Sequence, residues 1–137
     1  MKTREEALAY GLSFPYTYKE APFHDQNWEL VRVHGSKKAF LWVYERNGYI
    51  NMNVKVNPEW RDFWRKAYPA VQPGYHQNKE HWNTIILDGT IPDDTIKDMI
   101  AESYALVCDN PAKRIYEAVK RIPKAVSYTH LTLPTTE

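Results

Sequence analysis

Residues 73–93 read PGYHQNKEHWNTIILDGTIPD, and this stretch decides how the chain on either side of it can fold. Pro73 and Gly74 predict a turn at its start, because proline fixes its own backbone and glycine tolerates positive φ. The loop that follows places hydrogen-bond donors and flat rings close together: Tyr75, His76, Asn78, Lys79, His81 and Trp82. Such side chains in one loop are more typical of a functional surface than of a simple connection.

The second half of this stretch predicts a strand and the start of a helix. Residues 82–87 are apolar enough to cross the core as a strand, and Asp88-Gly89 predicts the turn that closes it. Pro92 comes next, followed by two carboxylates, and both features suit the first turn of a helix. We expect this helix to run to about residue 107, with one apolar side formed by Ile96, Met99, Ile100 and Val107.

Turn and cap signals divide the chain before residue 73. Thr3 and Glu6 form a capping box that predicts a first helix. Residues 12–22 predict an extended connection, because they contain two prolines around tyrosines. Three strands are then expected at residues 28–34, 38–45 and 49–56. Asn47-Gly48 between the last two is a strong hairpin signal.

Alternation in the third strand predicts the two faces of the sheet. One face carries Ile50, Met52, Val54 and Val56, and the other carries Asn51, Asn53 and Lys55. The first face is therefore expected in the core, and the second face is expected to meet water or a partner. Asn57-Pro58 then predicts the start of a second helix, whose residues Trp60, Phe63, Trp64 and Ala67 fall at helical spacing. This spacing predicts that two indoles are buried against the sheet.

The pattern GYH-x-NK-x-HWNT, followed by LDG-x-IPD, closely resembles the MmcQ/YjbR family of small bacterial proteins. Similar residues occur in the same register across roughly the first ~120 residues, the size of a small domain: Leu12-Ser13-Phe14-Pro15, Pro22-Phe23, Asn57-Pro58-Glu59, Tyr68-Pro69 and Ser103-Tyr104. The chain departs from the family pattern at His24, Val56 and Gln77, where glycine, cysteine and methionine are common. The resemblance implies a two-layer fold with projecting hairpins, described as a double wing, and a DNA-binding assignment.

The order of elements predicts the α+β class: helix, three strands, helix, one or two strands, then two helices. Because hairpins connect the strands, we expect a two-layer arrangement in which an antiparallel sheet carries helices on one face. Residues 1–125 are expected to form one domain. Its last helix would begin at Asn110-Pro111 and pack through Ile115, Ala118, Val119 and Ile122. Residues 126–136 look like a translated sequencing adapter, so we expect residues 126–137 to be a scar that is not native.

Composition narrows the class of protein. The chain has 18 basic and 17 acidic side chains, so net charge permits nucleic-acid binding without predicting it. Its single cysteine, Cys108, cannot form an internal disulfide, which indicates a reducing compartment. No long apolar run predicts a membrane span, and the first residues do not resemble a signal peptide. We therefore expect a cytoplasmic protein.

The first functional hypothesis is DNA binding through phosphate contacts from basic hairpin wings and the loop after Gly74. The candidate residues are Lys37, Lys38, Arg46, Lys55, His76, Asn78, Lys79 and His81. Nearby aromatic side chains such as Trp42 and Tyr44 could contact bases or sugars. Charged hairpin tips also serve simply to keep turns solvated and sheet edges apart. A second basic group, at Lys113, Arg114, Lys120, Arg121 and Lys124, is more typical of the solvated face of a terminal helix.

Two other classes remain open. For a metal-dependent or acid–base enzyme, His76 and His81 are spaced by five, which does not place them on one helical face, and no third ligand is specified. We therefore expect no enzyme activity, catalytic residues, metal or cofactor. A non-enzymatic module could instead bind a protein or a small ligand on the open aromatic face of the sheet. A third interpretation of the loop is architectural, with Asn78, Asn83 and Thr84 tying turns together.

Overall fold

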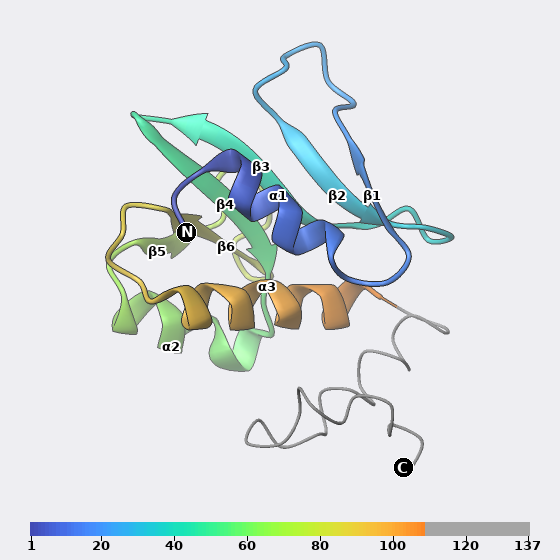
Figure 1. The fold of residues 1–137 in the computed structure, drawn as a ribbon. Helices are drawn as coiled ribbons and strands as arrows, with labels where there is room; N and C mark the ends of the chain where they lie inside the picture. Colours follow the sequence, from blue (N-terminus) through green and yellow to red (C-terminus); the bar gives the residue numbers. More distant parts are fainter. Residues whose placement is uncertain (109–137) are drawn as a thin grey trace, which may run out of the picture.

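The computed structural model describes residues 1–108 of the chain, in which six antiparallel strands form one sheet in the order β1-β2-β3-β4-β6-β5. Three helices complete the described part (Figure 1). In chain order the elements are α1 Arg4–Leu12, β1 Thr17–Glu20, β2 Glu29–Val33, β3 Ala39–Arg46, β4 Tyr49–Lys55, α2 Pro58–Ala67, β5 Val71–Pro73, β6 Trp82–Ile86 and α3 Asp93–Val107. The predicted α+β class with an antiparallel sheet is confirmed.

The local signals in the sequence act as expected. Thr3 and Glu6 form the capping box of α1, and the side chain of Asn57 accepts a hydrogen bond from the Glu59 amide at the start of α2. Asn47 and Gly48 have φ of 57° and 85°, so both residues of the β3–β4 turn adopt the left-handed conformation that such a turn requires. These short-range interactions fix boundaries of four elements: α1, α2, β3 and β4.

One strand was missed. The segment expected to be an extended connection contains β1, which pairs along its whole length with β2, from Thr17 opposite Val33 to Glu20 opposite Leu30. The strand has four residues and lies between two prolines. Because it is a short edge strand, its pairing depends on β2 rather than on an apolar pattern of its own.

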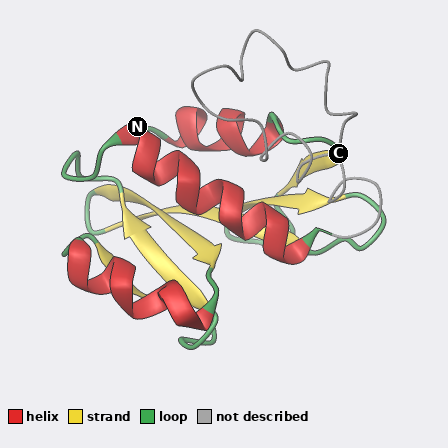
Figure 2. Ribbon diagram, turned by 90° about the horizontal axis from the view of Figure 1, so that it is seen from below, coloured by secondary structure: helices red, strands yellow, loops and turns green. Residues whose placement is uncertain are grey.

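All three helices pack on one face of the sheet, as predicted. α1 contacts β1, β2 and β3, α2 contacts β5 and β6, and α3 contacts β3 and β4. Figure 2 shows α3 lying across the strands. The core lies between this layer and the sheet, and it includes Val31, Leu41, Met52, Ile85 and Ile100. The other face of the sheet therefore carries no helix in the described part of the chain.

Helix α2 does not bury its aromatic side chains as the helical spacing predicted. Trp60 and Phe63 are 53% and 51% exposed, Ala67 is also exposed, and only Trp64 packs partly against the core. The reason is that α2 lies over β5 and β6, at one edge of the sheet. Helical spacing identifies an apolar stripe, but it does not establish that the sheet is wide enough to cover it.

A bulge in β3 is closed by a side chain from α3. Val31 pairs with Leu41 and Arg32 with Ala39, so Phe40 is the extra residue on β3. Ser103, which is fully buried, donates a hydrogen bond from Oγ to the Phe40 carbonyl at 2.6 Å and accepts one from the Lys55 amide at 2.8 Å. This hydroxyl therefore joins the helix layer to two strands.

In the described part of the chain, no helix has both the length and the apolar character needed to cross a bilayer. The predicted last helix, its basic group and the predicted adapter scar lie outside the described residues, and they stay predictions.

Candidate functional site

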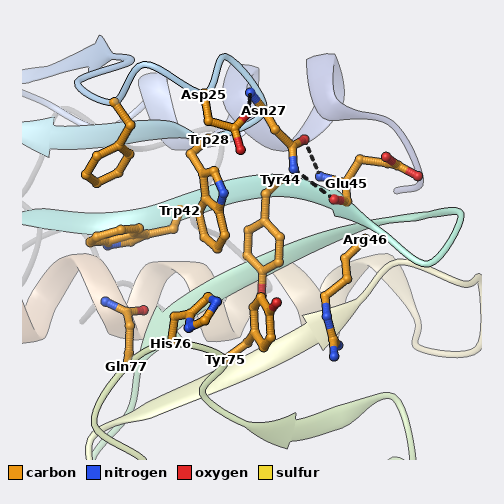
Figure 3. A pocket seen from close by; sticks show the side chains of 11 residues that line it. Asp25, Asn27, Trp28, Trp42, Tyr44, Glu45, Arg46, Tyr75, His76 and Gln77 are labelled. Atoms are coloured by element: carbon orange, nitrogen blue, oxygen red, sulfur yellow. Dashed lines mark hydrogen bonds between the residues drawn. The ribbon is translucent and has the colours of Figure 1, made fainter.

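A cavity of about 660 Å³ opens on the face of the sheet opposite to α1, α2 and α3 (Figure 3). Its walls come from three parts of the chain: the segment before β2, the strand β3, and the loop between β5 and β6, residues 74–81, here called the signature loop. The lining residues are Phe23, Asp25, Asn27, Trp28, Trp42, Tyr44, Glu45, Arg46, Tyr75, His76 and Gln77. The volume falls in the range of small-molecule sites.

Three aromatic rings in this cavity are nearly parallel. Trp28 stacks on Tyr44, with centroids 4.0 Å apart and planes inclined by 19°. Tyr75 is inclined by only 10° to Trp28 at 6.3 Å, and by 25° to Tyr44 at 5.8 Å. We call these three rings the aromatic platform. Trp42 stands edge-on to Trp28, at 85°, and forms a side wall.

The aromatic platform is held by a buried hydrogen-bond network centred on Asn53. Its Oδ1 accepts hydrogen bonds from the hydroxyls of Tyr44 and Thr84, both at 2.7 Å. Its Nδ2 donates to the Tyr75 carbonyl at 2.8 Å and to Oε1 of Gln77 at 2.9 Å. Asn53 is fully buried and Asn51 is 2% exposed, so the expectation that this face of β4 meets water or a partner is wrong for both. The signature loop covers Asn53 instead.

Backbone geometry also fixes the signature loop. A Cβ on Gly74 would lie 2.7 Å from Cβ of Trp82 and 2.9 Å from its carbonyl oxygen, so the chain can pass here only with glycine. His76 has φ of 62°, a left-handed conformation that is unusual for a non-glycine residue. Strained backbone of this kind is concentrated at functional sites.

The segment before β2 is tied to β3 on the opposite side of the cavity. Asn27 donates from Nδ2 to the Glu45 carbonyl at 2.9 Å and accepts from the Glu45 amide at 2.8 Å. Arg4 of α1 reaches the same asparagine side chain at 2.9 Å. Trp28 is the next residue after Asn27, so the hydrogen bonds of Asn27 also position the Trp28 ring. The Trp42 indole N–H has no acceptor in the described part of the chain, so packing alone positions that ring.

Charged groups lie at the edge of the platform. The Arg46 guanidinium lies 4.0 Å from the Tyr75 ring centroid, a cation–π contact. The carboxylates of Asp25 and Glu45 accept hydrogen bonds from the backbone amides of Asn27 and Gly48. Burial raises the pKa of Tyr44 to about 12, which outweighs the lowering effect of its contact with Thr84 and of the nearby Arg46. Tyr44 therefore remains a neutral phenol at ordinary pH.

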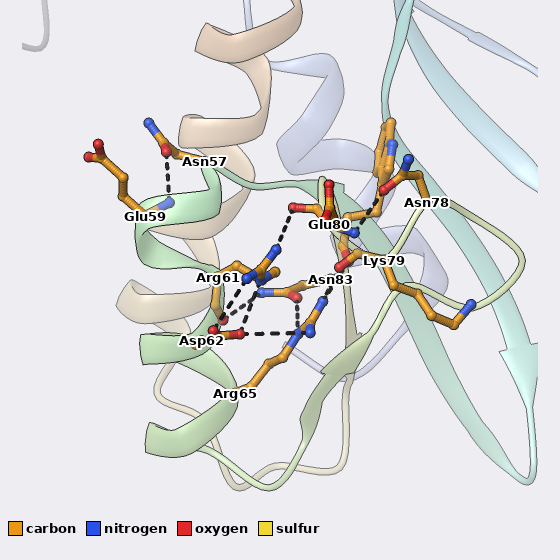
Figure 4. A network of polar contacts seen from close by, with 10 residues as sticks. Asn57, Glu59, Arg61, Asp62, Arg65, Asn78, Lys79, Glu80 and Asn83 are labelled. Atoms are coloured by element: carbon orange, nitrogen blue, oxygen red, sulfur yellow. Dashed lines mark hydrogen bonds and ion pairs between the residues drawn. The ribbon is translucent and has the colours of Figure 1, made fainter.

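The far end of the signature loop is held from α2 (Figure 4). Arg65 donates to Oδ1 of Asn83 at 2.8 Å and to the Lys79 carbonyl at 2.5 Å, and Arg61 donates to the Glu80 carbonyl at 3.3 Å. Asn78 accepts a hydrogen bond from the Glu80 amide at 2.8 Å. These contacts agree with the architectural interpretation of this end of the loop.

The residues proposed for DNA binding are not gathered at one place. Arg46 and His76 line the cavity. Lys37 and Lys38 are exposed at the β2–β3 turn, at the opposite end of β3 from Arg46 and roughly 25 Å away at the usual rise of a strand. Lys55 is partly buried at the far end of β4, and Asn78, Lys79 and His81 are exposed on the signature loop. The structure thus separates the candidates into the pair on the β2–β3 turn, the pair in the cavity, and the residues on the signature loop and at the end of β4.

Several lining residues were not identified as candidates from the sequence. Phe23 matched the family pattern but was not singled out as a site residue, and Asp25, Asn27 and Trp28 come from a segment without a recognisable motif. The only signal available was their aromatic and amide composition beside a strand. For the metal hypothesis, the described residues contain no group of three histidine, cysteine or acidic side chains placed to hold an ion.

Comparison with known proteins identifies the family. The family model described as YjbR matches residues 12–106. The chain belongs to the YjbR family. The uncharacterized Escherichia coli O157:H7 protein YbdF is 30% identical over 116 residues, which span 85% of this chain and 93% of YbdF. The uncharacterized Escherichia coli K12 protein YjbR is 30% identical over 102 residues, spanning 74% and 84% of the two chains.

Solved structures agree with this YjbR membership. The crystal structure of Deinococcus radiodurans DR2400, a DUF419-domain protein, matches with a TM-score of 0.74 and 30% identity, covering 83% of this chain and 86% of that one. A Pseudomonas syringae protein matches with a TM-score of 0.69 at 24% identity, covering 77% and 99% of the two chains, and it supports the fold alone. The YjbR resemblance seen in the sequence and the fold class are both confirmed.

Proposed function

We propose that this YjbR-family protein is a non-enzymatic binding module that holds a planar group on the aromatic platform. The observation that carries the proposal is the cavity of about 660 Å³ lined by Trp28, Trp42, Tyr44 and Tyr75. Concave sites with aromatic walls and a few polar groups are the usual form of small-ligand sites. DNA binding was our first hypothesis from the sequence, and a module that binds a protein or a small ligand on the open aromatic sheet face was the alternative.

Hydrogen bonds within the protein hold the platform, which favours binding. Asn53 fixes Tyr44 and Tyr75 through hydrogen bonds to the Tyr44 hydroxyl and the Tyr75 carbonyl, and Asn27 fixes the segment that carries Trp28. A rigid aromatic surface loses little side-chain entropy on binding, so more of the stacking energy appears as affinity. The acids Asp25 and Glu45 accept backbone hydrogen bonds, which suits a role in shaping the cavity rather than in proton transfer.

The test is a titration with indole, a planar probe, in which two-dimensional NMR spectra of the backbone amides monitor binding. We expect shifts confined to the cavity residues, and we expect Trp28→Leu to weaken binding about ten-fold or more, because one stacked ring contributes roughly 1–3 kcal/mol. Trp60→Leu is the matched control, since Trp60 is exposed on α2 and far from the cavity lining. Shifts that spread over α2, or equal affinity in Trp28→Leu, would reject the platform as the site.

DNA binding through phosphate contacts is the second candidate. It is supported by the exposed Lys37 and Lys38 on the β2–β3 turn and by exposed Lys79 on the signature loop. Such contacts give weak binding with little sequence preference and strong dependence on salt. A cytoplasmic location, where such a partner would be met, stays a prediction.

Fluorescence anisotropy of labelled duplex DNA tests this candidate. The charge reversal should be made at Lys38 and Lys79 and should leave Arg46 intact, because Arg46 also lines the cavity. We expect the double glutamate variant to abolish binding of the duplex while its indole titration stays unchanged. Duplex affinity that survives the double change would exclude the basic wings as the DNA-binding surface.

A further inference from the structure

Arg46 is the one arginine in the described part of the chain whose guanidinium has no carboxylate partner. The other four are paired within 4.0 Å: Arg4 with Glu29 at 3.2 Å, Arg32 with Glu20 at 2.6 Å, and Arg61 and Arg65 with Asp62 at 3.0 and 3.9 Å. The guanidinium of Arg46 makes a cation–π contact with Tyr75 and no hydrogen bond within the described residues. Its planar set of donors is therefore unused.

The two acids that line the cavity with Arg46 do not supply the missing partner. The Asp25 carboxylate accepts a hydrogen bond from the Asn27 amide, and the Glu45 carboxylate accepts one from the Gly48 amide. Glu45 does so although it is the immediate neighbour of Arg46 in the sequence. Adjacent residues on a strand point to opposite faces, which explains why Glu45 and Arg46 do not meet. Figure 3 shows the Arg46 side chain reaching down beside Tyr75.

The backbone that carries this guanidinium is fixed in the sheet. Arg46 is the last residue of β3 and pairs with Tyr49 across the turn. Its carbonyl accepts a hydrogen bond from Nδ2 of Asn51, which is buried, at 3.3 Å. The guanidinium carbon lies over the Tyr75 ring, 4.0 Å from its centroid, beside the aromatic platform. A fixed fork of donors of this kind matches a carboxylate or a phosphate.

We propose that the ligand of the platform carries an anionic group, a carboxylate or a phosphate, which Arg46 binds while the planar ring stacks on Trp28 and Tyr75. This inference rests on the proposed function, since it names the chemistry of the group held there. The shared chemistry is an aromatic ring with an attached anion. A small aromatic acid and a nucleotide both have it.

Matched pairs of probes test the anion directly by calorimetric titration. Indole carboxylate is compared with indole carboxamide, and adenosine monophosphate with adenosine. In each pair the ring is the same and only the charge differs. In at least one pair we expect the anion to bind about ten-fold or more tightly than its neutral partner, as a charge-assisted contact provides. The pair that shows this difference distinguishes the small acid from the nucleotide.

Arg46→Gln should remove the preference and bring the anion to the affinity of its neutral partner, while the neutral probe binds as before. Arg46→Lys keeps the charge and should retain part of the preference, which guards against a folding defect. Arg32→Gln is the matched control, because Arg32 is paired with Glu20 and does not line the cavity. The preference should also shrink with added salt.

The possible outcomes separate the two proposals. If neutral and anionic probes bind equally well and Arg46→Gln changes neither, the anion inference is overturned and the planar-group proposal stands. If none of the four probes binds, both proposals fail. If the anions bind more tightly but Arg46→Gln retains the full preference, another cation binds the anionic group, and Arg46 is excluded as its partner.

Discussion

The Thr84 hydroxyl donates a hydrogen bond to Oδ1 of Asn53 at 2.7 Å, at a position where the two residues are direct partners across β4 and β6. The Thr84 hydroxyl in turn accepts a hydrogen bond from the Tyr75 amide at 2.8 Å. The sheet and the signature loop are thus joined through one pair of side chains. A fully satisfied network of this kind gives a unique arrangement, and the loss of one member leaves the others unpaired.

Asn53→Leu should lower the free energy of unfolding by about 2–4 kcal/mol, because it leaves the buried Tyr44 hydroxyl and Tyr75 carbonyl without partners. Urea denaturation measures the change. Asn78→Ala is the control, since Asn78 is exposed and makes one local bond, and it should cost about 1 kcal/mol or less. Equal losses in the two variants would contradict the central role given to Asn53.

Ser103→Ala should destabilise the protein by about 1–3 kcal/mol, because the Phe40 carbonyl and the Lys55 amide both lose their partner in the core. Hydrogen exchange should show faster exchange of the Lys55 amide than in the parent chain. Ser13→Ala, at an exposed position, provides the comparison. An unchanged Lys55 amide would show that the bulge in β3 is closed by other means.

Alkaline pH should destabilise the protein partly through Tyr44. Burial raises its folded pKa to about 12 from an ordinary 10.0, so the unfolded chain loses this proton first. The stabilising contribution is therefore complete below about pH 10 and is lost as pH rises toward about 12, by roughly 2–3 kcal/mol. Urea melts of the parent and of Tyr44→Phe, compared across this range, isolate the effect. Parallel stability curves would contradict it.

His76→Gly should leave the unfolding free energy unchanged or raise it by up to about 1 kcal/mol, because glycine adopts the left-handed φ of 62° without strain. Lys37→Gly is matched in geometry, with φ of 63°, and lies outside the cavity. Indole affinity should fall only in the His76 variant. A fall in both variants would indicate a general loosening of the fold.

Short-range features of this fold were predictable from the sequence. The capping box at Thr3, the Asn57 cap and the Asn47-Gly48 turn each depend on residues within a few positions of one another. The α+β class followed from their order. The YjbR resemblance added the whole-domain arrangement, which local patterns do not contain.

The environment of Asn53 shows where such reasoning fails. Alternation along β4 correctly placed its side chain away from the helices, but no local pattern indicates that a loop from residues 75–77 covers it. The exposure of Trp60 has the same explanation, because no local pattern indicates that the apolar stripe of α2 extends beyond the edge of the sheet. The contact of Arg46 with Tyr75 joins residues 29 positions apart, so the cavity emerges only once the strands are paired.

Among the residues that the structure describes, the order of strands leaves β1 and β5 at the two edges of the sheet. β5 has only three residues and ends in Pro73, which has no amide to donate. β1 carries Lys19 and Glu20 at its exposed end, and charged residues on an edge disfavour pairing with another chain. A second molecule therefore has little opportunity to extend this sheet strand by strand, and concentrated samples should resist growth into fibrils.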